Sequence, residues 1–145
     1  MKEKLIKWEP IKNLEKIYEI KDITFIDLDM TINLFSKKDK KFKMMIYFEG
    51  IVFAYRYVQL NLYKSFEKNV TSVKNNNCIN TNWPFFKVLN SSYLKWLSEE
   101  SCTLSDMHGL THFIVMDTES SVEVLYAGDP EISFLQVDSL GEEKK

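Results

Sequence analysis

The stretch Leu110-Thr-His-Phe-Ile-Val-Met116 is apolar on both faces, with Thr111 and His112 as its only polar residues. A half-buried strand alternates apolar and polar residues, whereas a strand covered on both sides forms a continuous apolar run. The stretch therefore predicts the central strand of a sheet. Because His112 lies within it, we expect this imidazole to be buried and hydrogen-bonded to protein atoms rather than to a metal.

The flanking sequence predicts further short strands. Residues 24–34 alternate with period two, which predicts one half-buried strand with Asp27 and Asp29 on its solvated face. Residues 42–48 and 51–57 alternate again on either side of Glu49-Gly50, and a two-residue loop with a glycine predicts a hairpin. Alternation at 122–126 and a final run at 131–137 complete a set of seven or eight strands.

One substantial helix is expected after residue 90. Ser91 or Ser92 can supply the N-cap oxygen, and an apolar cluster follows at Tyr93, Leu94, Trp96 and Leu97. We therefore predict a helix over 92–101 that buries Trp96 and Leu97 against the sheet. The asparagine-rich stretch 68–82 is expected to be a mobile surface loop, and the last residues a frayed tail.

Length and composition point to one domain spanning 1–145. The 145 residues are 45% hydrophobic and 28% charged, which is ordinary for a globular protein. We expect an α+β fold with a mainly antiparallel sheet, strongly bent or closed into a half-barrel, and the main helix over one face. With no signal-peptide core, no apolar stretch long enough to span a membrane and only two cysteines, a cytoplasmic location without membrane contact is expected.

Nearly all basic residues of the sequence are lysines. Arg56 is the single arginine among 19 basic residues, and the formal net charge is −2. Arginine dominates the recognition of phosphates and bases because its planar fork donates two hydrogen bonds together. Nucleic acid is therefore not an expected partner.

The two histidines, His108 and His112, are the candidate residues for metal binding or catalysis. The spacing Cys102-x3-Asp106-x-His108-x3-His112 invites a metal site, but Gly109 separates the histidines and His112 falls in a predicted strand. A hydrolase could combine a serine or Cys102 with His108 and Asp106, yet no nucleophile-elbow or phosphate-loop motif accompanies them. We therefore expect no metal, no cofactor and no catalytic residues.

Charge is distributed unevenly along the chain. Residues 1–98 hold 17 basic and 10 acidic residues, whereas residues 99–145 hold 2 and 11. The C-terminal strands could neutralise the N-terminal strands through cross-strand pairs. Alternatively, acidic side chains could form a surface that attracts a basic protein partner, with candidate binding residues Glu119, Glu123, Asp129 and Glu131.

The stretch Phe86-Lys-Val-Leu-Asn-Ser-Ser-Tyr-Leu-Lys-Trp-Leu97, followed by 110–117 and 122–125, resembles small uncharacterised bacterial proteins encoded beside polymorphic toxins. Those proteins look like immunity or accessory proteins, so the resemblance implies binding rather than catalysis. We expect a non-catalytic protein-binding domain, with an immunity-type inhibitor of a cognate toxin as one form of it. The alternatives are a small enzyme or ligand-binding barrel using His108 and His112, and a self-associating structural subunit.

Overall fold

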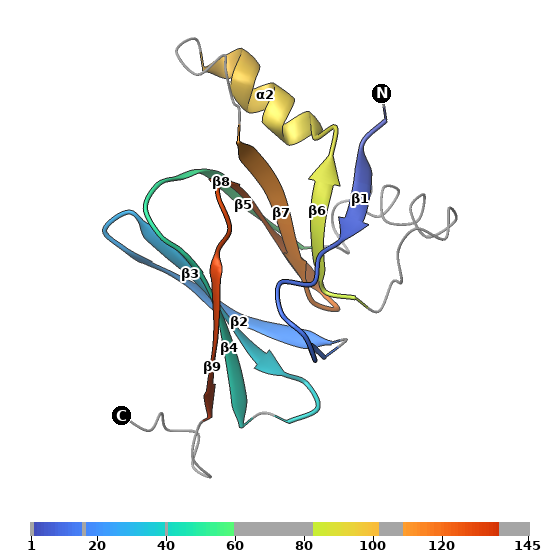
Figure 1. Cartoon of the computed structure of the whole chain (residues 1–145), viewed down its shortest axis with the longest axis vertical. Helices are drawn as coiled ribbons and strands as arrows, with labels where there is room; N and C mark the ends of the chain where they lie inside the picture. Colours follow the sequence, from blue (N-terminus) through green and yellow to red (C-terminus); the bar gives the residue numbers. More distant parts are fainter. Residues whose placement is uncertain (1, 16, 40, 60–82, 102–108, 137–145) are drawn as a thin grey trace.

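The computed structural model describes residues 2–15, 17–39, 41–59, 83–101 and 109–136, which hold nine strands and one α-helix (Figure 1). The elements are β1 (Lys4–Lys7), β2 (Tyr18–Ile26), β3 (Asp29–Ser36), β4 (Phe42–Phe48), β5 (Val52–Gln59), β6 (Phe85–Leu89), α2 (Ser92–Glu100), β7 (Leu110–Met116), β8 (Ser120–Ala127) and β9 (Glu131–Gln136). The predicted loop at 68–82 and the C-terminal tail lie outside the described residues.

The strands form two sheets. One has five strands in the order β1-β6-β7-β8-β5, and the other has four in the order β2-β3-β4-β9. Every strand pairing is antiparallel, as predicted, and β7 is the middle strand of the larger sheet. The prediction of one bent sheet or half-barrel is wrong, because the described strands divide into two separate sheets, neither closed into a barrel. The fold is mostly β rather than a balanced α+β arrangement.

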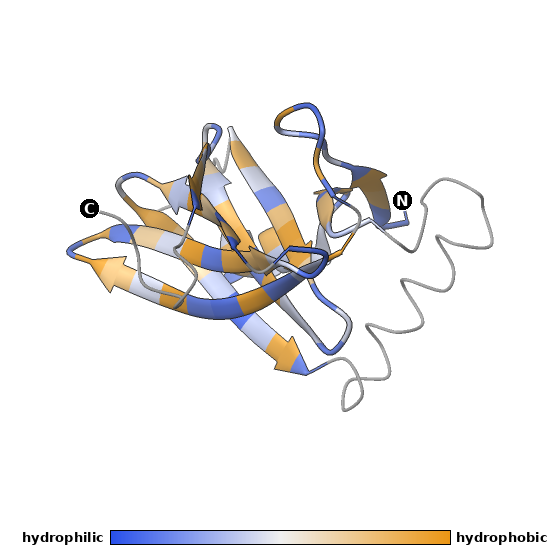
Figure 2. Cartoon of the chain, turned by 90° about the horizontal axis from the view of Figure 1, so that it is seen from below, coloured by the Kyte–Doolittle hydropathy of each residue, from blue (hydrophilic) through white to orange (hydrophobic). Residues whose placement is uncertain are grey.

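The core lies between the two sheets and is rich in aromatic rings. The Phe48 ring of the smaller sheet lies 5.8 Å from Phe113 and 5.1 Å from Tyr126 of the larger one, measured between ring centroids. Figure 2 shows hydrophobic and hydrophilic residues alternating along several strands, which directs one face of each strand inward. Each large apolar side chain that is fully buried contributes about 1.5–3 kcal/mol to folding.

The alternating stretch 24–34 is not one strand. It contains the end of β2, a turn at Asp27 and Leu28, and most of β3, with Ile26 paired to Asp29 across the turn. Asp27 adopts a φ of 53°, in the left-handed region that aspartate tolerates better than most residues. The alternation continues through the turn although Ile26 and Leu28 are exposed, so the pattern hides the reversal.

Residues 42–57 do not form the predicted hairpin. β4 pairs with β3 and β9, whereas β5 pairs with β8 in the other sheet. Residues 49–51 therefore carry the chain from one sheet to the other, with Gly50 at a φ of 83°. The Asp29 carboxylate accepts a hydrogen bond from the Gly50 amide at 2.6 Å and ties this crossing to the start of β3.

The helix begins where the sequence predicts, but its buried side differs. Ser91 is the N-cap, and its hydroxyl oxygen accepts from the Leu94 amide at 3.0 Å. Tyr93 is buried, whereas Trp96 is 51% exposed, so the prediction of Trp96 in the core is wrong. Leu97 is partly buried. Within the described ranges, no helix combines the length and apolar character needed to cross a bilayer.

Candidate functional site

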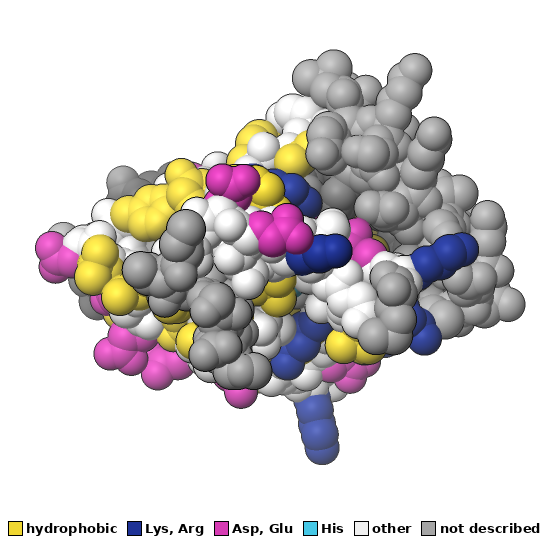
Figure 3. All heavy atoms as spheres, turned by 90° about the horizontal axis from the view of Figure 1, so that it is seen from above, with side chains coloured by type: hydrophobic (Ala, Val, Ile, Leu, Met, Phe, Trp, Pro, Cys, Tyr) yellow, Lys and Arg dark blue, Asp and Glu magenta, His cyan; other side chains and the backbone are white. Residues whose placement is uncertain are grey.

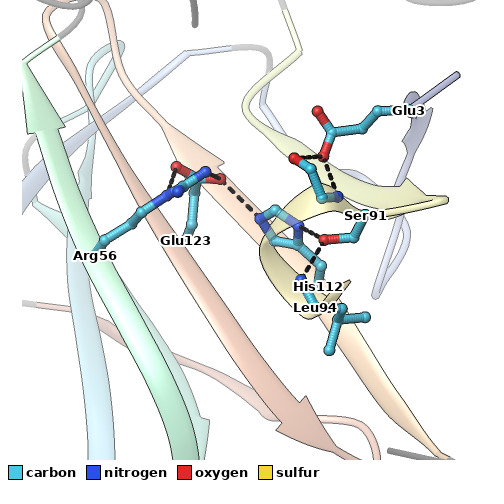
Figure 4. Close-up of polar contacts among 7 residues, drawn as sticks. Glu3, Arg56, Ser91, Leu94, His112 and Glu123 are labelled. Carbon is cyan, nitrogen blue, oxygen red and sulfur yellow. Dashed lines mark hydrogen bonds and ion pairs between the residues drawn. The ribbon is translucent and has the colours of Figure 1, made fainter. Parts of the chain in front are cut away.

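Polar side chains meet on the face of the larger sheet that carries α2. Arg56 comes from β5, Glu123 from β8, His112 from β7, and Ser91 from the residue before α2 (Figure 4). Arg56 stands directly opposite Glu123, while His112 lies diagonally from Glu123, two residues from its partner Ile114. Alternation along each strand therefore places the three strand residues on one face.

These side chains form a continuous chain of short contacts. The Arg56 Nε lies 2.7 Å from one carboxylate oxygen of Glu123, and Arg56 Nη2 lies 2.9 Å from the other. The His112 Nε2 lies 2.8 Å from Glu123 Oε1, and His112 Nδ1 lies 2.6 Å from Ser91 Oγ. The chain thus runs from edge strand β5 to the N-cap of α2.

The partners fix the direction of each hydrogen bond. An ionised carboxylate only accepts, so Nε2 of a neutral His112 donates to Glu123 and Nδ1 is left as an acceptor. The Ser91 hydroxyl donates to Nδ1, and its oxygen accepts from the Leu94 amide. We assign this tautomer because it gives each of these polar atoms a hydrogen-bond partner.

Burial makes this network electrostatically strong. Glu123 and His112 are each 1% exposed. Burial raises the pKa of Glu123, but hydrogen bonds from His112 and Arg56 outweigh it and hold that pKa below its ordinary value of 4.5. The guanidinium carbon of Arg56 lies 4.2 Å from the centre of the Tyr93 ring, which also contacts His112 edge-on. Desolvation by burial raises the pKa of Tyr93.

Ser91, His112 and Glu123 are the residue types of a nucleophile, a base and an orienting acid. However, the Ser91 oxygen already accepts from the helix, and Ser91 and His112 are 8% and 1% exposed. The residues proposed from sequence, Cys102, Asp106 and His108, lie outside the described residues. We therefore interpret the buried Ser91, His112 and Glu123 as a structural link between α2 and the larger sheet.

The structure separates the four acidic candidates for partner binding. Glu123 is buried against Arg56 and His112, so its expected exposure is wrong. Glu119, Asp129 and Glu131 are exposed, but Glu119 lies at the other end of β8 from the remaining two. Asp129 lies 3.8 Å from the Lys87 ammonium. The four residues do not share one surface.

A different group of exposed residues gathers near the β2–β3 turn and the 49–51 crossing. We call it the tip surface. The ring centroids of Phe25 and Tyr55 lie 5.2 Å apart, which joins the edges of the two sheets. Its apolar members and their exposed fractions are Phe25 47%, Ile26 74%, Leu28 63%, Ile51 56% and Tyr55 46%, and its exposed acidic members are Asp27, Glu49 and Glu131. Figure 3 shows hydrophobic and acidic side chains beside one another at this end of the molecule.

Asp29, Glu49 and Glu131 act on the same two tyrosines, Tyr47 and Tyr126. The hydroxyl of Tyr47 donates a hydrogen bond to Asp29, which raises the pKa of Tyr47 to about 12, with smaller contributions from burial and from the charges of Asp29, Glu49 and Glu131. The same three carboxylates also raise the pKa of Tyr126, although burial is the largest cause there. One end of the molecule therefore combines negative charge with exposed apolar area.

No match was found when the chain was compared with models of known protein families, with curated proteins and with solved structures. The described residues contain no group of three or more histidine, cysteine and acidic side chains arranged to hold a metal ion. Fold and site together define a two-sheet antiparallel β protein with a buried Arg-Glu-His-Ser network and an exposed tip surface.

Sequence reasoning missed both of these features, although each left a trace. Arg56, the single arginine, sits in an otherwise uncharged strand stretch, 51–59, which is a signal for a specific buried partner. Nothing in the sequence connects Ser91 with His112, because 21 positions separate them. The tip surface was hidden by the interpretation of 24–34 as one strand.

Proposed function

We propose that this protein is a protein-binding domain that docks a basic protein partner through the tip surface. The observation that carries the proposal is the group of five large, exposed apolar side chains that includes Phe25 and Tyr55. Exposed large apolar residues scattered singly are normal on a soluble protein, whereas a contiguous patch marks an interaction site. Aromatic residues in particular tend to supply much of the binding energy at interfaces.

Charge supports a basic partner rather than a second copy of this chain. Asp27, Glu49 and Glu131 are exposed in the same turn, crossing and strand start that carry or adjoin the apolar residues. A symmetric dimer through this surface would bring like charges together, which opposes self-association. A partner carrying lysine or arginine beside an apolar patch would satisfy both components and would be steered by long-range attraction.

The resemblance of residues 86–125 to toxin-associated bacterial proteins supports a more specific form of this function. An immunity-type inhibitor works by occluding a cognate toxin, so binding alone is sufficient and no chemistry is required. The alternative of an enzyme centred on His108 and His112 is less well supported, because His112 is 1% exposed and engaged on both ring nitrogens.

Affinity capture with paired variants tests the proposal. Wild-type protein, an Ile26→Ser/Leu28→Ser variant and a Leu89→Ser/Trp96→Ser variant serve as baits in an extract of the source cells. Each variant removes two apolar side chains that are about half exposed or more. Only the first variant changes the tip surface. We expect one basic protein to be retained by the wild type and by the Leu89/Trp96 variant, and lost from the Ile26/Leu28 variant. Equal retention by both variants would contradict docking at the tip.

Association kinetics with the captured partner test the charge component. Glu49→Lys and Glu131→Lys, as separate single variants, should each lower the association rate at 0.01 M salt, where the Debye length is about 30 Å, and much less at 1 M, where it is about 3 Å. Glu119→Lys is the matched control, since it reverses an exposed charge at the far end of β8. An equal effect of all three reversals would reflect net charge and not the tip surface.

A further inference from the structure

A cavity lies at the opposite end of the β2–β3 hairpin from the tip surface. It has a volume of about 480 Å³ and is lined by Leu14, Glu15, Ile17, Lys37 and Lys38. These residues come from the segment before β2 and the turn after β3. Pockets that hold small molecules usually measure about 300–1,000 Å³, so the space suits a small ligand.

Hydrogen bonds hold the two walls of the cavity together. The Lys37 amide donates to the Ile17 carbonyl at 3.4 Å, and the Ser36 hydroxyl donates to the Glu15 carboxylate. The Ser36 oxygen in turn accepts from the Asp39 amide at 3.0 Å, and the Glu15 amide donates to the Tyr18 hydroxyl at 3.2 Å. These hydrogen bonds therefore fix the segment before β2 against the turn after β3.

The lining combines apolar area with unpaired positive charge. Leu14 packs against the core, and Ile17 remains 41% exposed beside it. Lys37 and Lys38 are exposed, and neither forms an ion pair with another residue in the described part of the chain. Glu15 is already engaged by Ser36. Among the described lining residues, two ammonium groups outnumber one carboxylate, which favours an anionic ligand.

We propose that this cavity binds a small monoanionic amphiphile, an apolar body the size of a medium-length acyl chain carrying one carboxylate. The apolar body covers Leu14 and Ile17, and the carboxylate lies between Lys37 and Lys38. Lysine suits this role because its ammonium group is a compact point charge on a flexible stem that can follow the head group. The site is independent of the tip surface, since it lies at the other end of β2 and β3.

Calorimetric titration with matched ligands tests the apolar and charged components. Decanoate, used below its micelle concentration, should bind with one-to-one stoichiometry. Acetate carries the same head group without the apolar body, and decyltrimethylammonium carries the same chain with the opposite charge. We expect both to bind at least about tenfold more weakly. Equal binding of decanoate and decyltrimethylammonium would overturn the proposal, because it would show nonspecific apolar association.

Charge-removing variants locate the site. Lys37→Gln with Lys38→Gln should weaken decanoate binding about three- to tenfold, as expected for two exposed charge contacts. Lys4→Gln with Lys95→Gln removes the same charge from exposed positions on β1 and α2 and should leave decanoate affinity unchanged. Urea unfolding of both variants verifies that each is folded. An equal loss of affinity in both pairs would place the ligand elsewhere and overturn the proposal.

Discussion

Arg56 and Glu123 face each other across β5 and β8 and form a two-point ion pair, with N–O distances of 2.7 and 2.9 Å. Glu123 is buried, whereas 38% of the Arg56 side chain stays exposed. Part of the acidic C-terminal third is therefore neutralised inside the sheet by the single arginine of the N-terminal part. Cross-strand pairing, one of the two explanations of the charge distribution, is confirmed for this residue.

Replacement of Glu123 should strongly destabilise the protein. Glu123→Gln leaves Arg56 without its counter-ion and replaces one of the two acceptor oxygens with an amide NH2 group, which cannot accept from Arg56. Breaking a buried ion pair costs about 3–5 kcal/mol, and we expect the lower end, about 3 kcal/mol, because Arg56 is partly hydrated. Urea unfolding measures the change. Glu119→Gln, at an exposed position, should change stability by less than about 0.5 kcal/mol. Similar small losses in both variants would refute the buried network.

The same carboxylate predicts how stability depends on pH. Its pKa is lower in the folded protein than its ordinary value of 4.5. Ionised Glu123 therefore contributes its full stability above about pH 4.5, and this contribution is lost as the pH falls through the folded pKa. The difference in unfolding free energy between wild type and Glu123→Gln should shrink progressively below about pH 4.5. A difference that stayed constant down to pH 3 would contradict the lowered pKa.

Ser91 should matter for stability and not for catalysis. Ser91→Ala removes the helix N-cap, which costs about 0.5–2 kcal/mol, and leaves the His112 Nδ1 without its donor, which costs about 1–3 kcal/mol more. We expect a total loss of about 2–3 kcal/mol and partial rescue by Ser91→Thr, which retains a hydroxyl. Hydrolysis of p-nitrophenyl acetate should be equally slow in wild type and Ser91→Ala. Wild-type hydrolysis that Ser91→Ala abolished would instead identify Ser91 as a nucleophile.

The two aromatic residues of α2, Tyr93 and Trp96, should differ in their contribution to the free energy of unfolding. Tyr93 is 7% exposed and contacts both Arg56 and His112, whereas Trp96 is 51% exposed. Tyr93→Ala should cost about 3 kcal/mol, comparable to other large buried aromatics, and Trp96→Ala less than about 1 kcal/mol. Thermal or urea unfolding of the two variants gives the comparison. A larger loss for Trp96→Ala would place the opposite side of the helix against the sheet.

The Tyr47 hydroxyl should lose its proton only at unusually high pH, because it donates a hydrogen bond to the Asp29 carboxylate. Its pKa is about 12, against an ordinary value of 10.0. Asp29→Asn removes the charged acceptor and should bring the Tyr47 pKa down toward 10, since the hydrogen bond is the largest cause of the shift. Absorbance titration of tyrosinate, with Tyr47→Phe to identify the transition, measures it. An unaltered titration in Asp29→Asn would assign the shift to other causes.

Local features of the fold were predictable from sequence. The continuous apolar run 110–116 predicted the central strand, and its histidine was correctly expected to be buried with protein partners. The N-cap was predicted at Ser91 or Ser92, because a hydroxyl before an apolar cluster signals a helix start, and Ser91 occupies it. The final strand, expected over 131–137, is β9 at Glu131–Gln136.

The candidate sites were less predictable, because they combine residues that are distant in sequence. Arg56 and Glu123 are 67 positions apart, and Phe25 and Tyr55 belong to different sheets. An alternating pattern shows which face of a strand is buried but not which strand lies beside it. The 24–34 and 42–57 misassignments both follow from this ambiguity.

The sequence by itself determined where most strands lie, where the helix begins and that His112 is buried, because these features depend on neighbours within a few positions along the chain. Only the tertiary structure decided that β4 and β5 belong to different sheets, that Glu123 is buried and that Ile26 and Leu28 are exposed. The physical reason is that strand pairing is a competition among all compatible strands. Its outcome depends on the packing of the whole core, so an acidic residue can lie in water or opposite an arginine with the same local pattern.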